Sequence, residues 1–109
     1  MDFGSKRLNR SEGELRLTMR DGRRDSQLLL FAELRETLVP RLTRRLGELG
    51  HVVRRVEVPS DARPYPGSRF ACSVETADGG RLTVHCELRP RRLRPARVGR
   101  VRYAIAPAA

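Results

Sequence analysis

The sequence predicts an α+β fold in which an antiparallel sheet of four to five strands carries a helix on one face. Three observations lead to this prediction. Apolar and polar residues alternate in several short segments, apolar residues recur at three- and four-residue steps between positions 26 and 49, and Gly- or Pro-containing turns separate these segments. The predicted order is β-α(α)-β-β-β-β, in which the second α allows for a helix that Pro splits.

An arm and a strand form the predicted N-terminal part. Residues 1–13 are polar and contain Gly and Ser, so we expect a flexible arm before a single domain over residues 14–106. From Glu14 on, Leu and Met alternate with polar residues, which predicts a strand that ends at Asp21-Gly22.

A helix is predicted next. Asp25 or Ser26 can cap its start, and Gly50 is a natural residue to end it. Pro40 cannot donate a backbone hydrogen bond and disfavours a helical Val39, so we expect the helix to be kinked or split there. Its apolar stripe consists of Phe31, Leu34, Leu38, Leu42, Leu46 and Leu49.

The remaining strands are predicted from period-two alternation. A strand with Val52, Val56 and Val58 on one face precedes a Pro-rich loop over residues 59–68. A hairpin follows, and a last strand contains Val101, Tyr103 and Ile105. The hairpin strands alternate at Phe70, Cys72, Val74 and Thr76 and at Leu82, Val84, Cys86 and Leu88.

The register of this hairpin is predicted from its turn. A three-residue loop of Asp78-Gly79-Gly80 keeps the apolar residues of both strands on one face. It places Cys72 opposite Cys86, Val74 opposite Val84 and Ser73 opposite His85. The other face of the sheet is then polar and suits solvent or a polar partner; it carries Arg55, Glu57, Ser73, Glu75, Thr83, His85, Glu87, Arg100 and Arg102.

The formal net charge of +10 over 109 residues is unevenly distributed. Residues 51–88 hold equal numbers of bases and acids, whereas residues 89–109 hold seven Arg and no acid. No apolar segment resembles a signal peptide or is long enough to span a membrane, so we expect a cytoplasmic protein with reduced thiols. A concentrated positive field of this kind favours an acidic partner.

The Arg-rich loop over residues 89–97 is the main functional candidate. Its two Pro favour an extended conformation, from which guanidinium groups can fork onto a row of phosphates. We therefore expect a small nucleic-acid-binding protein of regulatory or phage-accessory type, which grips DNA or RNA through the phosphate backbone. The expected binding residues are Arg89, Arg91, Arg92, Arg94, Arg97, Arg100 and Arg102.

A structural or adaptor protein is the alternative. The same Arg-rich loop could dock an acidic protein surface. The run Leu28, Leu29, Leu30 and Phe31 is apolar around the whole helix, so part of it needs a further cover, which a second subunit could supply. The adaptor alternative therefore predicts a homo-oligomer.

Catalysis and metal binding have little support in the sequence. Two Cys and two His do not form a metal-ligand motif, and we expect no cofactor. Ser73, His85 and a neighbouring Glu share a predicted face, but no Gly-rich elbow accompanies them to form an oxyanion hole. Tyr65 could stack on a base, but the scarcity of aromatic residues argues against a stacking platform for single strands.

The order strand, helix, helix, strand, strand, strand resembles that of the small basic RelE-type toxins. That resemblance covers element order only. It implies a ribonuclease that cuts RNA without a metal, with His85 and Tyr103 as the candidate catalytic residues beside Arg102.

Overall fold

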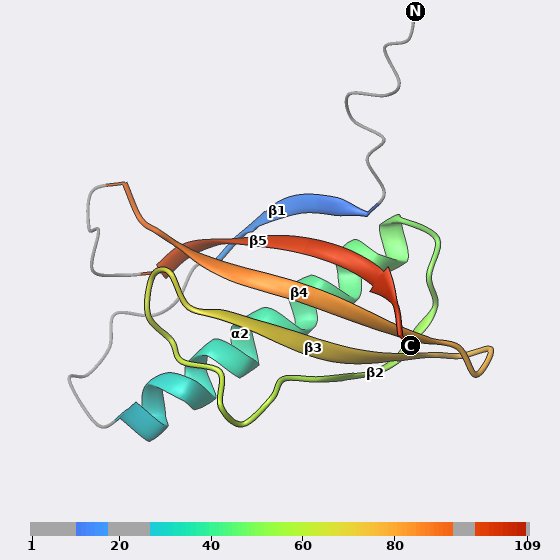
Figure 1. The fold of residues 1–109 in the computed structure, drawn as a ribbon, viewed down its shortest axis with the longest axis horizontal. Coiled ribbons are helices and arrows are strands. Elements are labelled where there is room, and N and C mark those ends of the chain that lie inside the picture. The colour runs from blue at the N-terminus through green and yellow to red at the C-terminus, as the bar shows by residue number, and fades with distance from the viewer. Residues whose placement is uncertain (1–10, 18–26, 93–97, 109) are drawn as a thin grey trace, which may run out of the picture.

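A five-stranded antiparallel sheet with one helix across one face forms the protein (Figure 1). The computed structural model describes residues 11–17, 27–92 and 98–108, and the side chains of residues 27–30 lie outside this description. The elements are β1 (Glu12–Arg16), α2 (Gln27–Glu48), β2 (Val53–Glu57), β3 (Arg69–Thr76), β4 (Arg81–Pro90) and β5 (Val98–Pro107).

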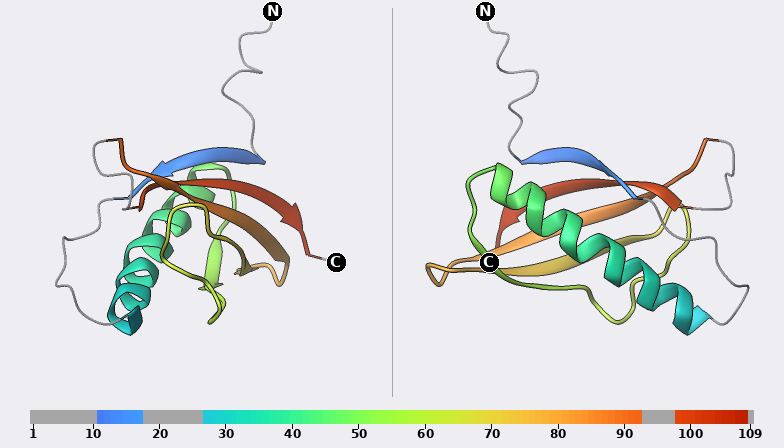
Figure 2. Two further views of the ribbon diagram at one scale, coloured as in Figure 1. Left: turned by 60° about the vertical axis from the view of Figure 1, so that its left-hand side comes forward. Right: turned by 180° about the vertical axis from the view of Figure 1, so that it is seen from behind.

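The strand order is β1-β5-β4-β3-β2, and every neighbouring pair is antiparallel. Strands β2 to β5 form a meander, and β1 pairs with the last strand. Helix α2 lies diagonally across one face of the sheet, and none of the helices and strands that the structure describes covers the opposite face (Figure 2). The predicted α+β fold, an antiparallel sheet of four to five strands with a helix on one face, is confirmed, and the sheet has five strands.

Helix α2 continues through Pro40 without ending, so the predicted split does not occur. Pro40 is exposed, and so is Glu36, whose carbonyl loses its helical partner. Water can therefore hydrate that carbonyl. Gly50, with φ of +99°, ends the helix as predicted, because His51 N donates to Leu46 O at 2.9 Å and Gly50 N to Gly47 O at 3.0 Å.

The core lies between α2 and the sheet. Four leucines one turn apart along α2 are completely buried, as the stripe predicts. They face alternate residues of the sheet, and Phe31 and Leu49 pack at the margins. The buried set is Leu34, Leu38, Leu42 and Leu46 from α2, Leu15, Leu17, Phe70, Cys72, Val74, Val84, Cys86, Leu88, Val98, Val101 and Tyr103 from the sheet and its flanks, and Ala62 from the loop after β2.

Both edge strands differ from their predicted extents. Strand β1 begins at Glu12, within the predicted arm, and the predicted strand end and helix cap at residues 21–26 lie outside the described residues, as do residues 1–10. Strand β2 buries Val53 rather than Val52, which is 69% exposed. A bulge between Val53 and Arg55 inserts one residue, so Val53 and Val56 face the core although three positions separate them.

The register of the β3–β4 hairpin is two residues away from the prediction. Cys72 lies opposite Val84, and Val74 lies opposite Leu82. The same residues still face the core, because a shift by two preserves the face. The loop is Ala77-Asp78-Gly79: Thr76 N donates to Gly80 O at 2.9 Å, and Gly79 has φ of +88°. The Asp78 carboxylate accepts from the Thr76 hydroxyl and the Gly80 N–H, which selects this loop.

Candidate functional site

The open face of the sheet, opposite α2, carries the polar residues predicted there. Strand pairing arranges them in rows that run across the strands. One row contains Arg16, Arg100 and Arg89 from β1, β5 and β4, and the next contains Glu14, Arg102, Glu87 and Arg69. A third contains Glu12, Ala104, His85 and Ala71, and a fourth contains Ala106, Thr83, Ser73 and Glu57.

The first row, which we call the arginine row, sets like charges side by side. Arg100 lies directly opposite Arg16 on one neighbouring strand and opposite Arg89 on the other. Like charges at opposed positions destabilise a sheet, so strand pairing alone does not favour the row. Its members lie at the end of the sheet where β4 leads into the Arg-rich loop.

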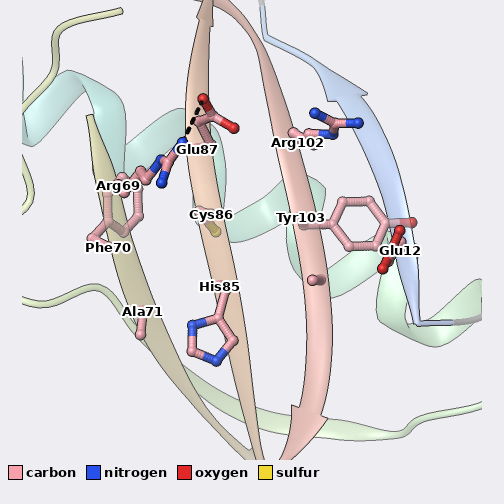
Figure 3. Close-up of a pocket in the computed structure, with 10 residues that line it drawn as sticks. Glu12, Arg69, Phe70, Ala71, His85, Cys86, Glu87, Arg102 and Tyr103 are labelled. Atoms are coloured by element: carbon pink, nitrogen blue, oxygen red, sulfur yellow. Dashed lines mark ion pairs between the residues drawn. The ribbon is translucent and has the colours of Figure 1, made fainter. Parts of the chain in front are cut away.

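The second row offsets only part of this charge. Glu87 Oε2 lies 3.7 Å from Arg89 Nη1 and 3.8 Å from Arg69 Nη2, and Glu14 Oε1 lies 3.6 Å from Arg100 Nη1. The Arg69–Glu87 pair is drawn in Figure 3. These partly exposed pairs contribute little to stability. The two glutamates therefore leave most of the neighbouring guanidinium charge unbalanced.

The chain that leaves β4 adds further charge beside the arginine row. Arg91 and Arg92 are exposed. Arg91 lies against Gly99, since a Cβ on Gly99 would be only 2.4 Å from Arg91 Cγ and 3.1 Å from Arg91 Cα. The basic end, as we call this surface, consists of Arg16, Arg69, Arg89, Arg91, Arg92, Arg100 and Arg102.

Five of the seven arginines predicted for the site belong to the basic end. Arg94 and Arg97 lie outside the described residues. Sequence reasoning missed Arg16 and Arg69. Each alternates with a buried neighbour, which places it on the open face, but its nearness to the Arg-rich loop depends on long-range strand pairing.

A hollow of about 660 Å³ lies on the open face beside the basic end (Figure 3). Ala71 and Ala104 flank His85 on the two neighbouring strands, and the small side chains leave the imidazole standing between them. Two arginines and two glutamates also line the hollow: Arg69, Arg102, Glu12 and Glu87. The predicted pairing of Ser73 with His85 is wrong, because Ser73 lies opposite Thr83 and Ala71 lies opposite His85.

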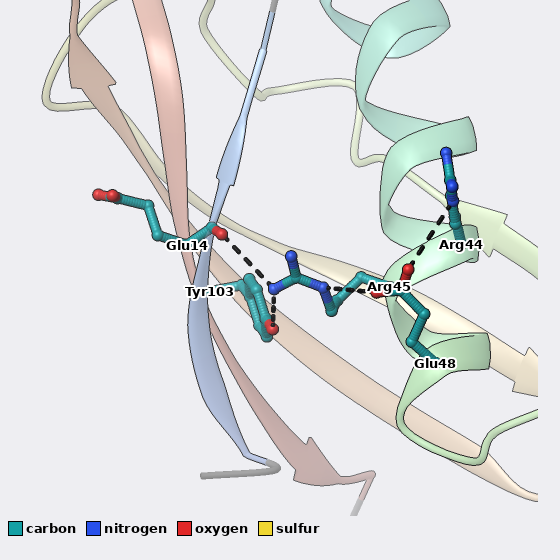
Figure 4. Close-up of polar contacts among 5 residues, drawn as sticks. All are labelled: Glu14, Arg44, Arg45, Glu48 and Tyr103. Atoms are coloured by element: carbon teal, nitrogen blue, oxygen red, sulfur yellow. Dashed lines mark hydrogen bonds and ion pairs between the residues drawn. The ribbon is translucent and has the colours of Figure 1, made fainter. Parts of the chain in front are cut away.

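Tyr103 belongs to the core side of the sheet. It is 3% exposed, and its hydroxyl accepts a hydrogen bond from Arg45 Nη1 of α2 at 2.8 Å (Figure 4). The same Nη1 approaches Glu14 O at 3.5 Å, and Arg45 Nε donates to Glu48 at 3.1 Å. The bond to Tyr103 is the main cause that raises the pKa of Arg45. Arg45 thus connects α2 to β5 and β1.

The three residues of the RelE-type hypothesis do not form one constellation. His85 and Arg102 lie on the open face, whereas the Tyr103 hydroxyl lies on the helix side and is bonded to Arg45. A phenol held in this way cannot reach a substrate bound beside His85. The geometry gives no support to Tyr103 as a catalytic residue.

Both cysteines are buried free thiols on the core side. The observed register places Cys72 opposite Val84 and Cys86 opposite Phe70, so the thiols are diagonal neighbours rather than an opposed pair. Hydrogen bonding to Cys72, followed by burial, raises the pKa of Cys86 well above its ordinary value. Within residues 11–17, 27–92 and 98–108, no three metal-ligating side chains gather.

The structure describes only some of the residues that were predicted for self-association or base stacking. The side chains of Leu28, Leu29 and Leu30 lie outside the described residues, and Phe31 packs partly buried against the core. Tyr65, in the loop between β2 and β3, is 41% exposed. Of the described part of the chain, no helix is both long and apolar enough to cross a membrane.

Comparison with known proteins returned no relative. No protein-family model, no curated protein sequence and no solved structure matches the chain.

Proposed function

We propose that this protein binds nucleic acid through the phosphate backbone at the basic end, as a regulatory or phage-accessory factor of the cytoplasm. One observation carries the proposal. Seven arginines from three strands, the start of β3 and the Arg-rich loop gather at one end of the open face, beside only two glutamates. The arginine row lies outside the core, and two glutamates offset only part of its charge, so positive charge remains for a ligand.

The spacing of the arginine row suits a run of phosphates. Its three members lie on three adjacent strands, and neighbouring strands are about 4.8 Å apart, so the row extends over about 10 Å. Along the axis of a duplex, the phosphates of one strand rise by about 3.4 Å per nucleotide, so the row extends over about three nucleotides of such a strand. Each guanidinium can donate two parallel hydrogen bonds to one phosphate.

Salt titration with matched charge variants tests the proposal. The site variant combines Arg16→Gln, Arg89→Gln and Arg100→Gln. The control removes the same charge elsewhere, at three exposed positions: Arg35→Gln on α2, Arg54→Gln on the opposite edge strand β2, and Arg81→Gln at the other end of β4 from Arg89. Each phosphate contact contributes about 0.7 to 0.9 to the steepness with which log affinity falls with log salt. The site variant should therefore make this negative slope shallower by about 2 to 3.

The control variant should keep nearly the whole slope. An equal loss in both variants would mean that net charge alone drives binding, and absence of binding at low salt would remove the proposal. Polyglutamate serves as the probe for the adaptor alternative: tight binding to polyglutamate without binding to DNA or RNA would assign the basic end to an acidic protein. Sedimentation velocity tests self-association through residues 28–31.

A further inference from the structure

We propose that the hollow around His85 receives one unpaired base of a single-stranded nucleic acid whose phosphates lie on the basic end. The inference rests on the proposed function and specifies its ligand. It concerns the part of the open face around His85, where two arginines of the basic end, Arg69 and Arg102, are matched by two glutamates.

The hollow has the size and position for a base. Its volume of about 660 Å³ is within the range of about 300 to 1,000 Å³ that small-ligand pockets occupy. His85 is exposed, and only Ala71 and Ala104 flank it on the neighbouring strands, so a flat group can approach the imidazole. Histidine is among the side chains on which unstacked bases rest in complexes with single strands.

The charge of the hollow favours a neutral base over a phosphate. Arg69 and Arg102 line it together with Glu12 and Glu87, so arginines and glutamates are equal in number. Glu87 already pairs with Arg69, which lowers the attraction of that arginine for an anion inside the hollow. The excess positive charge lies outside, at the arginine row.

The distance between the two parts suits one nucleotide chain. One row of the sheet, which contains Glu87, lies between His85 and the arginine row, because alternate residues of β4 share a face. Four residues of an antiparallel strand extend over about 14 Å. A strand that leaves its phosphates on the arginine row can therefore place a nearby base over His85, whereas a duplex keeps its bases paired inside.

The hollow is suited to one base rather than to a series. A platform for several stacked bases needs several exposed rings. His85 is the one aromatic side chain that the described rows of the open face carry. The contribution of the hollow should therefore be the same for short and long oligomers.

Three ligands with equal numbers of phosphates distinguish the contribution of the hollow to affinity from that of the basic end. They are a deoxyadenosine oligomer, an abasic oligomer of the same length, and a duplex. The variant is His85→Ala, and Thr83→Ala is the control, because Thr83 lies on the same face of β4 outside this hollow. His85→Phe keeps a ring and should restore binding. Affinity is measured by fluorescence anisotropy at fixed salt.

We expect His85→Ala to weaken binding of the deoxyadenosine oligomer by about tenfold, in the range of one stacked base. Binding of the abasic oligomer and of the duplex should remain unchanged, and Thr83→Ala should resemble the wild type. Equal affinity of wild-type protein for the abasic and the base-containing oligomer would overturn the inference and leave the phosphate proposal intact. Failure of all three ligands to bind at low salt would overturn both.

Discussion

Gly13 of β1 supports the contact between the edge strand and Tyr103, and its replacement gives a sharp test of this packing. Gly13 lies opposite Tyr103 in the β1–β5 pair. A Cβ at position 13 would be 2.4 Å from the Tyr103 hydroxyl oxygen and 2.7 Å from its Cζ. The backbone of Gly13 does not have positive φ, so the clash with the ring is the reason that glycine is needed.

The cost of Gly13→Ala follows from how little the ring can move. Tyr103 is 3% exposed, and its hydroxyl is bonded to Arg45, so the added methyl must displace either the ring or the edge strand. Insertion of one methyl into a packed site of this kind costs about 2 kcal/mol. The midpoint of urea unfolding, followed by far-ultraviolet circular dichroism, should then fall by about 1 to 2 M.

Two further variants make the reasoning refutable. Tyr103→Leu removes the atoms that clash, so Gly13→Ala should cost almost nothing in that background, which gives a coupling energy of about 2 kcal/mol. Gly47→Ala is the control, because a Cβ there meets nothing within 4 Å and alanine favours a helix. If Gly13→Ala is neutral, or costs the same with and without the tyrosine ring, the packing argument is wrong.

Four further predictions concern both faces of the sheet. Tyr103→Phe should lower the free energy of unfolding by about 1 kcal/mol, because it removes one hydrogen bond, while nucleic-acid affinity at fixed salt stays unchanged. Pro40→Ala should raise the melting temperature, with a gain of about 1 to 3 kcal/mol, since Pro40 is an exposed residue inside a continuous helix. Cys72 and Cys86 should resist a thiol reagent in the folded protein and react only on unfolding, because both are buried and the pKa of Cys86 is raised; rapid labelling under native conditions at neutral pH would contradict this. Arg16→Thr should leave the free energy of unfolding unchanged or raise it by about 0.5 kcal/mol, because it removes a like-charge neighbour, and should weaken binding in the salt titration.

Sequence patterns predicted which residues form the helix and the strands better than they predicted how the strands pair. Alternation of apolar residues marked the core faces of β3, β4 and β5, and the leucine stripe marked the buried face of α2. The hairpin register was predicted two residues away from the observed one, because both Gly79 and Gly80 can adopt the left-handed conformation. The side-chain hydrogen bonds of Asp78 select Gly79, and strict alternation could not predict the bulge that buries Val53.

The candidate site was predicted only in part, again because local sequence patterns do not encode strand pairing. Excess charge after residue 88 identified the Arg-rich loop and the open-face positions of Arg100 and Arg102. Arg16 joins them only because β1 pairs with β5, a contact between residues about 84 positions apart that local patterns do not encode. Tyr103 was predicted as a candidate catalytic residue although alternation along β5 already places it on the core face. Its hydrogen bond to Arg45, which holds the hydroxyl on the helix side, is a long-range contact that the sequence pattern does not show.

The two faces of the sheet divide stability from the proposed binding role. The core face is apolar and continuous with the leucines of α2, and its one tyrosine is held by an arginine of the helix. The rest of the open face contains small, polar and charged residues of both signs, and opposite charges oppose each other in places, as in the pair of Arg55 with Glu75. Among the described strand pairs, three arginines lie directly side by side only at the basic end, an arrangement that strand pairing disfavours. This departure from local pairing rules at one end of one face supports the proposed phosphate site, because charge that serves only solubility can be spread over the whole surface.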